Sequence, residues 1–280
     1  MKTLSIITIN KNNAGGLEKT IQSVVCQTYT DLEYIVIDGA SGDESVEIIK
    51  KYADKINYWV SEPDTGIYNA MNKGICEAKG EYCLFLNSGD WLISSSTLDN
   101  VFKEISGNPS DIFYSDRINT DNTIVRYPKS MTIDFLLERR INHQNSLLRR
   151  SLFLKHGLYN ENLKIASDWE YFLNEYWRYK STFYHIETNI SVFDIHGIGS
   201  QKSVERFAEN TMVLKNVFQE LANIIIEHHN FRSTIYYGII TEIGDTKILS
   251  YLLRFYRKSY LIIGRIISIF YYQNKKEGNA

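Results

Sequence analysis

The chain has 280 residues and is 44% hydrophobic, which is ordinary for a folded globular protein and enough for one large core or two modest ones. Its 31 lysines and arginines nearly balance its 33 aspartates and glutamates, giving a net charge of -2 at pH 7. This balance gives no global reason to expect a nucleic-acid partner, so any site for a polyanion must be local.

The cysteines are odd in number and widely spaced, and none belongs to a CxxC pair. We interpret Cys26, Cys76 and Cys83 as reduced core residues of a cytosolic protein rather than as metal ligands. Residues 1–9 become polar too soon for a secretory signal, and no uncharged apolar run approaches the ~18 residues of a membrane span. We therefore expect a cytoplasmic protein.

Short strand-like runs alternate with helical patterns over the first ninety residues. This alternation predicts an α/β fold, with a mostly parallel sheet that has helices on both faces. The last of the runs is almost continuously apolar, which is typical of a strand buried on both faces. The expected strands are 4–9, 33–37, 58–60 and 82–86, and the expected helices are 17–25 and 67–75.

Polar residues follow each of these strands. In an open sheet, ligands bind outside the carboxyl ends of the strands, near a switch in strand order. Ser41 or Asp43 is expected to cap the next helix, whereas Asp38 has no evident structural task. Since three of the four strand ends carry a carboxylate, we predict a ligand site on this edge. The residues that follow the strands are Asn10, Asp38-Gly39, Glu62-Pro63-Asp64 and Asn87-Ser88-Gly89-Asp90.

Beyond residue 90 the pattern is less regular, apart from a predicted helix through 168–173. After residue 204 the pattern becomes helical, with candidate helices at 207–228 and 248–272. The expected division is an α/β domain over residues 1–205, with halves 1–90 and 91–205, followed by a helical extension over 206–280.

The last helical candidate is strongly amphipathic, because its four basic residues fall within an arc of about 100° and leave a broad apolar face. Such a helix suits an anionic membrane surface, and packing on the preceding domain or on a second subunit is the alternative. Residues 251–272 are therefore a candidate for peripheral membrane contact or for a homo-oligomer interface. The basic residues are Arg254, Arg257, Lys258 and Arg265.

The run Asn87-Ser88-Gly89-Asp90 could be a simple strand-to-loop turn with Asp90 as a cap. A hard divalent cation such as Mn²⁺ or Mg²⁺, however, prefers oxygen ligands from one or two carboxylates, with phosphate oxygens completing the shell. One carboxylate at a strand end, beside a second that can hold a base or ribose, is enough for a metal bound by a diphosphate.

Four segments, in this order and spacing, resemble the family-2 glycosyltransferases with the GT-A fold. They lie in the first ninety residues, and a thinner match continues to about residue 200. The resemblance implies a Rossmann-like sheet with a C-terminal helical extension, a nucleotide-sugar-binding half and an acceptor half. The segments are SIITIN (5–10), QTYTDLEYIVIDGASGD (27–43), SEPDTGIYNAMNKG (61–74) and GEYCLFLNSGD (80–90).

The same resemblance implies a nucleoside-diphosphate sugar as donor, with a UDP-sugar as the first candidate. Asp38 would face the base, and Asp64 and Lys73 would lie near the ribose and diphosphate, although Lys73 also reads as a solvated helix residue. The implied donor-binding residues are Thr8, Asn10, Asp38, Asp64, Lys73, Ser88 and Gly89.

The metal motif of the family usually has acidic residues at two or three of the positions 87–90, and this chain keeps only Asp90. The resemblance therefore implies a Mn²⁺ or Mg²⁺ ion that binds Asp90 only together with the donor's phosphates. His196, in the glycine-containing turn 196–200, is a second candidate ligand.

Sugar transfer with inversion needs a carboxylate that takes the proton of the acceptor hydroxyl. Asp168 matches the position at which the family has this base. The residue before it is usually acidic in the family, and here it is Ser167. The alternative is that Asp168 caps a helix starting at Trp169. Further residues are expected on the acceptor side, although His143 could instead be a buried, hydrogen-bonded histidine. They are His143, Gln144, Trp169 and Glu170.

The sequence thus predicts an inverting, metal-dependent glycosyltransferase that acts on a glycan or lipid-linked acceptor in cell-surface polysaccharide assembly. A peripheral position on the inner face of the plasma membrane is a candidate location. One alternative is a sugar nucleotidyltransferase, which would need a glycine- and lysine-rich loop after the first strand; residues 11–16 (KNNAGG) are a poor version of it. Another is a non-catalytic nucleotide-binding subunit.

Overall fold

A computed structural model of the chain describes residues 3–195, 203–223 and 225–226. Its contacts divide the chain into one unit over Met1–Asn210 and another over Thr211–Ala280. The division expected at residue 205 stays a prediction.

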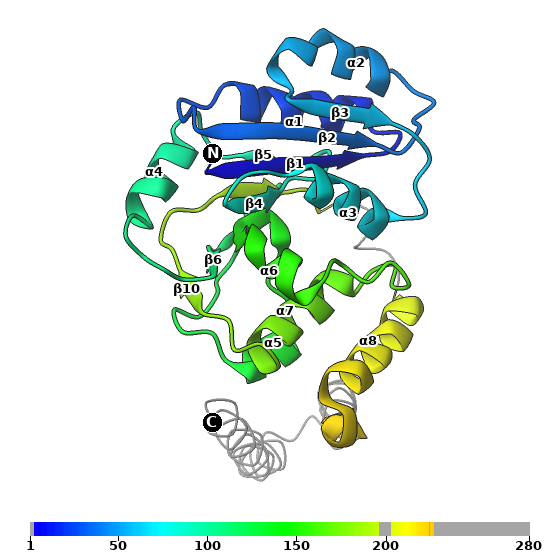
Figure 1. Cartoon of the computed structure of the whole chain (residues 1–280), viewed down its shortest axis with the longest axis vertical. Coiled ribbons are helices and arrows are strands. Elements are labelled where there is room, and N and C mark those ends of the chain that lie inside the picture. Colours follow the sequence, from blue (N-terminus) through cyan, green and yellow to red (C-terminus); the bar gives the residue numbers. More distant parts are fainter. Residues whose placement is uncertain (1–2, 196–202, 224, 227–280) are drawn as a thin grey trace, which may run out of the picture. The chain divides into compact units, whose positions relative to one another are not determined.

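The main sheet has seven strands in the order β10-β6-β9-β4-β1-β2-β3 (Figure 1). All neighbouring pairs are parallel except those that β9 makes with β4 and β6. The expected mostly parallel sheet is therefore confirmed, with one antiparallel strand inside it. The strands are β1 Leu4–Asn10, β2 Leu32–Asp38, β3 Tyr58–Ser61, β4 Tyr82–Phe85, β6 Ile112–Tyr114, β9 Ser146–Arg149 and β10 Phe183–His185.

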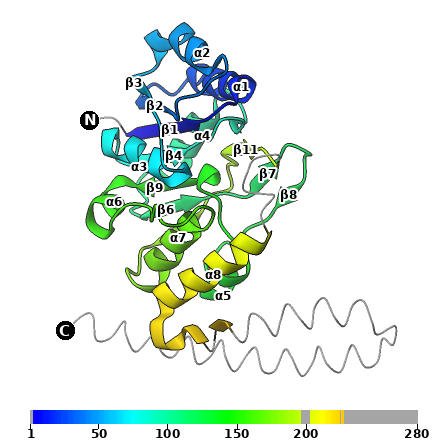
Figure 2. The same cartoon turned by 90° about the vertical axis from the view of Figure 1, so that its right-hand side faces the viewer.

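Helices flank this sheet on both faces because side chains of successive strand residues point to opposite sides (Figures 1 and 2). On β1, Leu4 and Ile6 join a core cluster with Leu17 of α1, whereas Ile7 faces α3. A Cβ added to Gly74 of α3 would lie 2.4 Å from Cγ2 of Ile7, so only glycine permits this close approach. The helices are α1 Ala14–Val25, α2 Ser45–Lys51, α3 Ile67–Glu77, α4 Thr97–Glu104, α5 Ile133–Glu138, α6 Arg150–His156, α7 Ser167–Trp177 and α8 Ser203–Phe218.

The strand order places a switch point between β1 and β4. From β1 the chain moves outward to β2 and β3, and then returns to β4 on the other side of β1. Connections leaving the carboxyl ends of β1 and β4 therefore diverge, and ligands bind in the crevice that such a divergence opens. Asn10 ends β1 and the Asn87–Asp90 turn follows β4 at this point.

A small second sheet closes over this turn, with strand order β5-β11-β7-β8. Its strand β5 directly follows Asp90, and β11 returns from about one hundred residues later to pair with it in antiparallel register. The strands are β5 Trp91–Leu92, β7 Arg117–Asn119, β8 Ile124–Val125 and β11 Ser191–Phe193, and the short 3-10 turns are Ala53–Lys55, His143–Asn145 and Gln219–Leu221.

Two local expectations are wrong. Helix α2 begins at Ser45 with Glu44 as its N-cap, so neither Ser41 nor Asp43 holds that position. One oxygen of the Asp43 carboxylate accepts a hydrogen bond from the N–H of Ser45 (3.1 Å), and the other accepts one from the N–H of Ala14 (2.9 Å). Asp43 thus ties the start of α1 to the start of α2, and Ser41 bonds to Asp38.

The cysteine prediction holds only in part. All three cysteines are free, as expected, and Cys83 is buried on β4. Cys26 and Cys76 are exposed, because Cys26 is the C-cap of α1 and Cys76 lies in the last turn of α3, away from the sheet-facing side of each helix.

Helix α8 and the turn after it occupy most of the predicted 207–228 helix, but α8 begins earlier, at Ser203. Within the described residues, no helix is both long and apolar enough to cross a membrane. The basic segment 251–272 lies outside the described residues, so membrane or partner contact there stays a prediction.

Candidate active site

Asp38 is fully buried and connects the carboxyl ends of three strands. Its two oxygens accept hydrogen bonds from the Asn10 amide (2.7 Å), the Ser41 hydroxyl (2.6 Å) and N–H (3.0 Å), and the Ser61 hydroxyl (2.6 Å). Burial alone would raise the pKa of Asp38, but these bonds lower it overall. The sequence-based view that Asp38 lacks a structural task is therefore wrong, since four donors fill its acceptor sites.

Thr8 is also fully buried, and its hydroxyl lies 3.0 Å from the Tyr34 hydroxyl. Thr8 and Asp38 therefore shape the strand ends from within the sheet. Asp64 lies at the same edge, because a Cβ added to Gly39 would be 2.2 Å from Oδ2 of Asp64. The structure thus brings the predicted donor-site residues of β1, β2 and the loop after β3 together.

Lys73 of α3 is not a freely solvated residue. Its ammonium forms an ion pair with Glu62 (2.8 Å) and donates to the carbonyl of Pro63 (3.0 Å). It therefore fastens α3 to the loop after β3, beside Asp64, and its charge is already partly compensated there.

The Asn87–Asp90 turn is held by a hydroxyl of α1. Thr20 accepts a hydrogen bond from the N–H of Gly89 (3.0 Å) and donates one to the carbonyl of Asp90 (2.7 Å). Gly89 has φ +105°, a conformation that favours glycine. Ser88 lies on the outer side, where Asn13 donates to its carbonyl (3.0 Å). Asp90 does not cap a helix, because β5 follows it.

The Asp90 carboxyl is 3% exposed and accepts a hydrogen bond from the backbone N–H of Asp194 (2.8 Å). Burial raises the pKa of Asp90 to about 7, although this hydrogen bond, the Gln144 amide and His143 act in the opposite direction. A nearby cation would favour its charged form.

The donor set around Asp90 fits a hard divalent cation. The side-chain oxygens of Gln144 and Asn87 are buried and have no hydrogen-bond partner in the described part of the chain. Carboxylate and amide oxygens are ligands that Mn²⁺ and Mg²⁺ accept. No cluster of three His, Cys, Asp or Glu side chains suited to a metal occurs among the described residues, so ligands from outside this set would have to complete the shell. His196 lies outside the described residues.

Asp168 lies in the first turn of α7, whose N-cap is Ala166, so the capping alternative is wrong. Its carboxylate accepts hydrogen bonds from the Tyr68 hydroxyl (3.0 Å) and from Nδ1 of His143 (3.3 Å). Burial alone would raise the pKa of Asp168, but contact with His143, the guanidinium of Arg140 and the Tyr68 hydroxyl lower it overall. The group is therefore a partly buried carboxylate, 16% exposed, whose surroundings favour its charged form.

His143 joins this carboxylate to the Asn87–Asp90 turn. Its Nε2 lies 3.3 Å from the side-chain nitrogen of Asn87, so the tautomer with its proton on Nδ1 satisfies both contacts. His143 is 7% exposed, as the buried, hydrogen-bonded alternative expected. The two regions singled out from the sequence, Asp168 and the turn, are thus connected by one hydrogen-bond chain.

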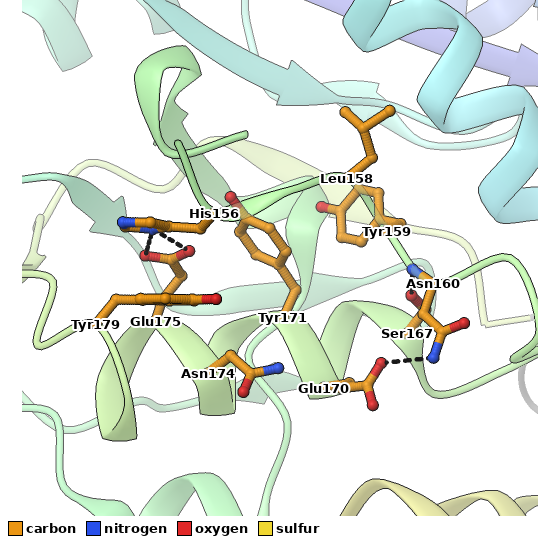
Figure 3. Close-up of a pocket in the computed structure, with 10 residues that line it drawn as sticks. All are labelled: His156, Leu158, Tyr159, Asn160, Ser167, Glu170, Tyr171, Asn174, Glu175 and Tyr179. Atoms are coloured by element: carbon orange, nitrogen blue, oxygen red, sulfur yellow. Dashed lines mark hydrogen bonds and ion pairs between the residues drawn. The ribbon is translucent and has the colours of Figure 1, made fainter. Parts of the chain in front are cut away.

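The backbone N–H of Trp169 donates to the Asp168 carboxylate (2.8 Å), but the side chains of Trp169 and Glu170 point elsewhere. The Trp169 indole donates to the carbonyl of Leu136 (2.6 Å) and packs inside the fold. Glu170 accepts a hydrogen bond from Asn160 (3.0 Å) and lines a separate cavity of about 50 Å³ that neither Asp168 nor His143 lines (Figure 3). Their place on the acceptor side stays a prediction.

Three residues of the site were missed by sequence reasoning. Tyr68 lies within the motif at 61–74 but received no role, although a hydroxyl there was a possible signal. Thr20 and Asp194 gave no local signal, because each reaches the turn through tertiary contacts alone.

Comparisons with known proteins identify the family of the chain. The model of the family Glycosyl transferase family 2 matches residues 5–165. A PGL/p-HBAD biosynthesis glycosyltransferase of Mycobacterium bovis is 35% identical over 172 residues, which cover 60% of this chain and 67% of the relative.

Two solved structures have a similar fold. The crystal structure of S. aureus TarS 1-349 in complex with UDP-GlcNAc has a TM-score of 0.67 and 18% identity over 87% of this chain and 76% of that chain. The mannosyltransferase PcManGT from Pyrobaculum calidifontis, in complex with GDP-Man and Mn²⁺, has a TM-score of 0.61 and 15% identity over 94% of this chain and 86% of that chain. Because the family match spans more than half of the chain and the α/β sheet is that of GT-A transferases, this protein belongs to glycosyl transferase family 2 and is a glycosyltransferase.

Proposed function

We propose that this glycosyltransferase moves a sugar, with inversion, from a nucleoside-diphosphate sugar to a hydroxyl of a glycan or lipid-linked acceptor. The observation that carries the proposal is the partly buried Asp168 carboxylate, linked through His143 to Asn87 of the donor-side turn. One network thus joins a base to the turn next to which a diphosphate would bind.

In this reaction Asp168 takes the proton of the acceptor hydroxyl. The acceptor oxygen forms a bond to the anomeric carbon while the bond from that carbon to the diphosphate oxygen breaks, and the nucleoside diphosphate leaves with the bonding electrons. Tyr68 and His143 hold the carboxylate in one orientation and favour its charged form.

For the donor side we propose a UDP-sugar, held at the edge formed by Asn10, Asp64, Lys73, Ser88 and Gly89. Thr8 and Asp38 would act from beneath, because both are fully buried. The TarS structure with UDP-GlcNAc supports a nucleotide-sugar donor on this fold.

We further propose that Asp90 holds Mn²⁺ or Mg²⁺ together with the donor's phosphates, with His196 as a further candidate ligand. Bound there, the cation would offset the charge that develops on the leaving diphosphate. The buried oxygens of Gln144 and Asn87 support this assignment, as does Mn²⁺ in the PcManGT complex.

For the acceptor we propose a surface glycan or its lipid-linked precursor, with His143, Gln144, Trp169 and Glu170 on the acceptor side. The name of the mycobacterial PGL/p-HBAD relative supports a glycoconjugate product. Three further proposals rest on the sequence pattern. They are a cytoplasmic location, peripheral membrane contact or self-association through residues 251–272, and the domain halves 1–90 and 91–205.

The direct test is release of nucleoside diphosphate from a panel of nucleotide sugars, with glycan and lipid-linked acceptors. Asp168→Asn should abolish release, whereas Asp134→Asn, which removes a first-turn carboxylate from α5, should not. Pyrophosphate release from a nucleoside triphosphate would instead support a nucleotidyltransferase, and binding without turnover across the panel would support a non-catalytic subunit.

A further inference from the structure

Asp194 directly follows β11 and lies opposite the Asn87–Asp90 turn. The antiparallel register pairs Ser191 with Leu92 and Val192 with Trp91, so two residues further on Asp194 stands opposite Gly89. Its backbone N–H donates to the Asp90 carboxylate at 2.8 Å. The small sheet therefore fixes the position of Asp194 relative to Asp90 through backbone pairing.

The Asp194 carboxylate lies where a side chain of residue 89 would point. A Cβ added to Gly89 would be 2.9 Å from Oδ2 and 3.5 Å from Cβ of Asp194. The turn itself carries a single carboxylate, Asp90. A second carboxylate thus reaches the turn from a distant strand and occupies the space that the glycine leaves.

An independent observation points to a cation between these groups. Gln144 is 3% exposed, its amide contacts the Asp90 carboxyl, and its side-chain oxygen lacks a hydrogen-bond partner among the described residues. The side-chain oxygen of Asn87 is also buried without such a partner. Buried acceptors are normally paired with a donor or with a metal ion, and two carboxyl groups beside them add negative charge.

We propose that Asp194 is a second carboxylate ligand of the divalent cation at Asp90. This inference rests on the proposed function, because the donor's diphosphate supplies the remaining ligands. Asp194 then restores in space the acidic partner that the turn lacks in sequence.

The test is Mn²⁺ binding by the full chain, measured from the loss of the electron paramagnetic resonance signal of free Mn²⁺, with and without UDP. Asp194→Asn keeps the backbone N–H and the side-chain volume, so the fold should persist; thermal unfolding checks this. Asp121→Asn is the matched control, since Asp121 lies in the β7–β8 connection of the same small sheet and its carboxylate accepts hydrogen bonds from the N–H and hydroxyl of Thr123.

With UDP present, Asp194→Asn should weaken Mn²⁺ binding at least tenfold, whereas Asp121→Asn should bind Mn²⁺ as the wild type does. Without metal, the three proteins should bind UDP with equal affinity. Wild-type Mn²⁺ affinity in Asp194→Asn, together with loss of binding in Asp90→Asn, would overturn the role of Asp194 and leave the metal site standing. Absence of UDP-dependent Mn²⁺ binding in the wild type would overturn both. If Asp194→Asn lost metal-free UDP binding by the same factor as it lost Mn²⁺ binding, the ligand role of Asp194 would also be overturned.

Discussion

Replacing Thr20 by valine removes the hydroxyl that holds the Asn87–Asp90 turn while keeping the shape of the side chain. Thr20 is fully buried, and its hydroxyl pairs with the N–H of Gly89 at 3.0 Å and with the carbonyl of Asp90 at 2.7 Å. Each buried backbone group left without a partner costs about 1–3 kcal/mol. Because the turn can relax in part, we expect the free energy of unfolding to fall by about 2–4 kcal/mol.

For a domain of this size, such a loss lowers the unfolding midpoint by roughly 4–16 °C, which calorimetry or circular dichroism would measure. Thr20→Ser keeps the hydroxyl and should lose less. Thr120→Val is the matched control, because the Thr120 hydroxyl is buried and has no hydrogen-bond partner within the described residues. Equal stability of Thr20→Val and the wild type, or an equal loss in Thr120→Val, would refute the proposed role of this hydroxyl.

Three further predictions concern the base, the metal and the core. His143→Gln should raise the pKa of Asp168, because His143 lowers that pKa. Since only the charged carboxylate accepts a proton, the acidic limb of the pH profile of kcat/KM should move to higher pH. An unchanged pH profile would exclude this coupling between His143 and Asp168. Chelation of divalent cations should abolish both turnover and the rise in melting temperature that UDP causes with Mn²⁺, and Mn²⁺ should restore both; full turnover in chelator would contradict the metal role. Gly74→Ala should cost about 1–3 kcal/mol of stability, measured by denaturant unfolding, because its Cβ would meet Ile7 at 2.4 Å; a neutral substitution would contradict the tight α3 packing.

The parallel half of the fold could be predicted from the sequence because its strands are local patterns. The four expected strands match β1 to β4 to within about one residue at each end. The antiparallel β9 and the small sheet could not be predicted, since pairs such as β5 with β11 depend on contacts between segments about one hundred residues apart.

The candidate site shows the same limit. Asp90 and Asp168 stood out because motifs mark them, but the His143 link between their regions depends on how α7 and the turn meet in space. Asp43 precedes the N-cap of α2, and its carboxylate bonds both to Ser45 of that helix and to Ala14 of α1; the second bond is a tertiary contact without a local signal in the sequence.

In the proposed reaction, Asp168 is the base of a sugar transfer from a nucleoside-diphosphate donor. The most direct measurement is acceptor-dependent release of UDP from the preferred UDP-sugar by the wild type and by Asp168→Asn, with equal donor binding verified for both proteins. We expect kcat to fall by about 10²-fold or more with donor affinity retained, as loss of a general base produces. Turnover within a factor of about two of the wild type would contradict this role, because the Asp168 carboxylate would then have no part in the reaction.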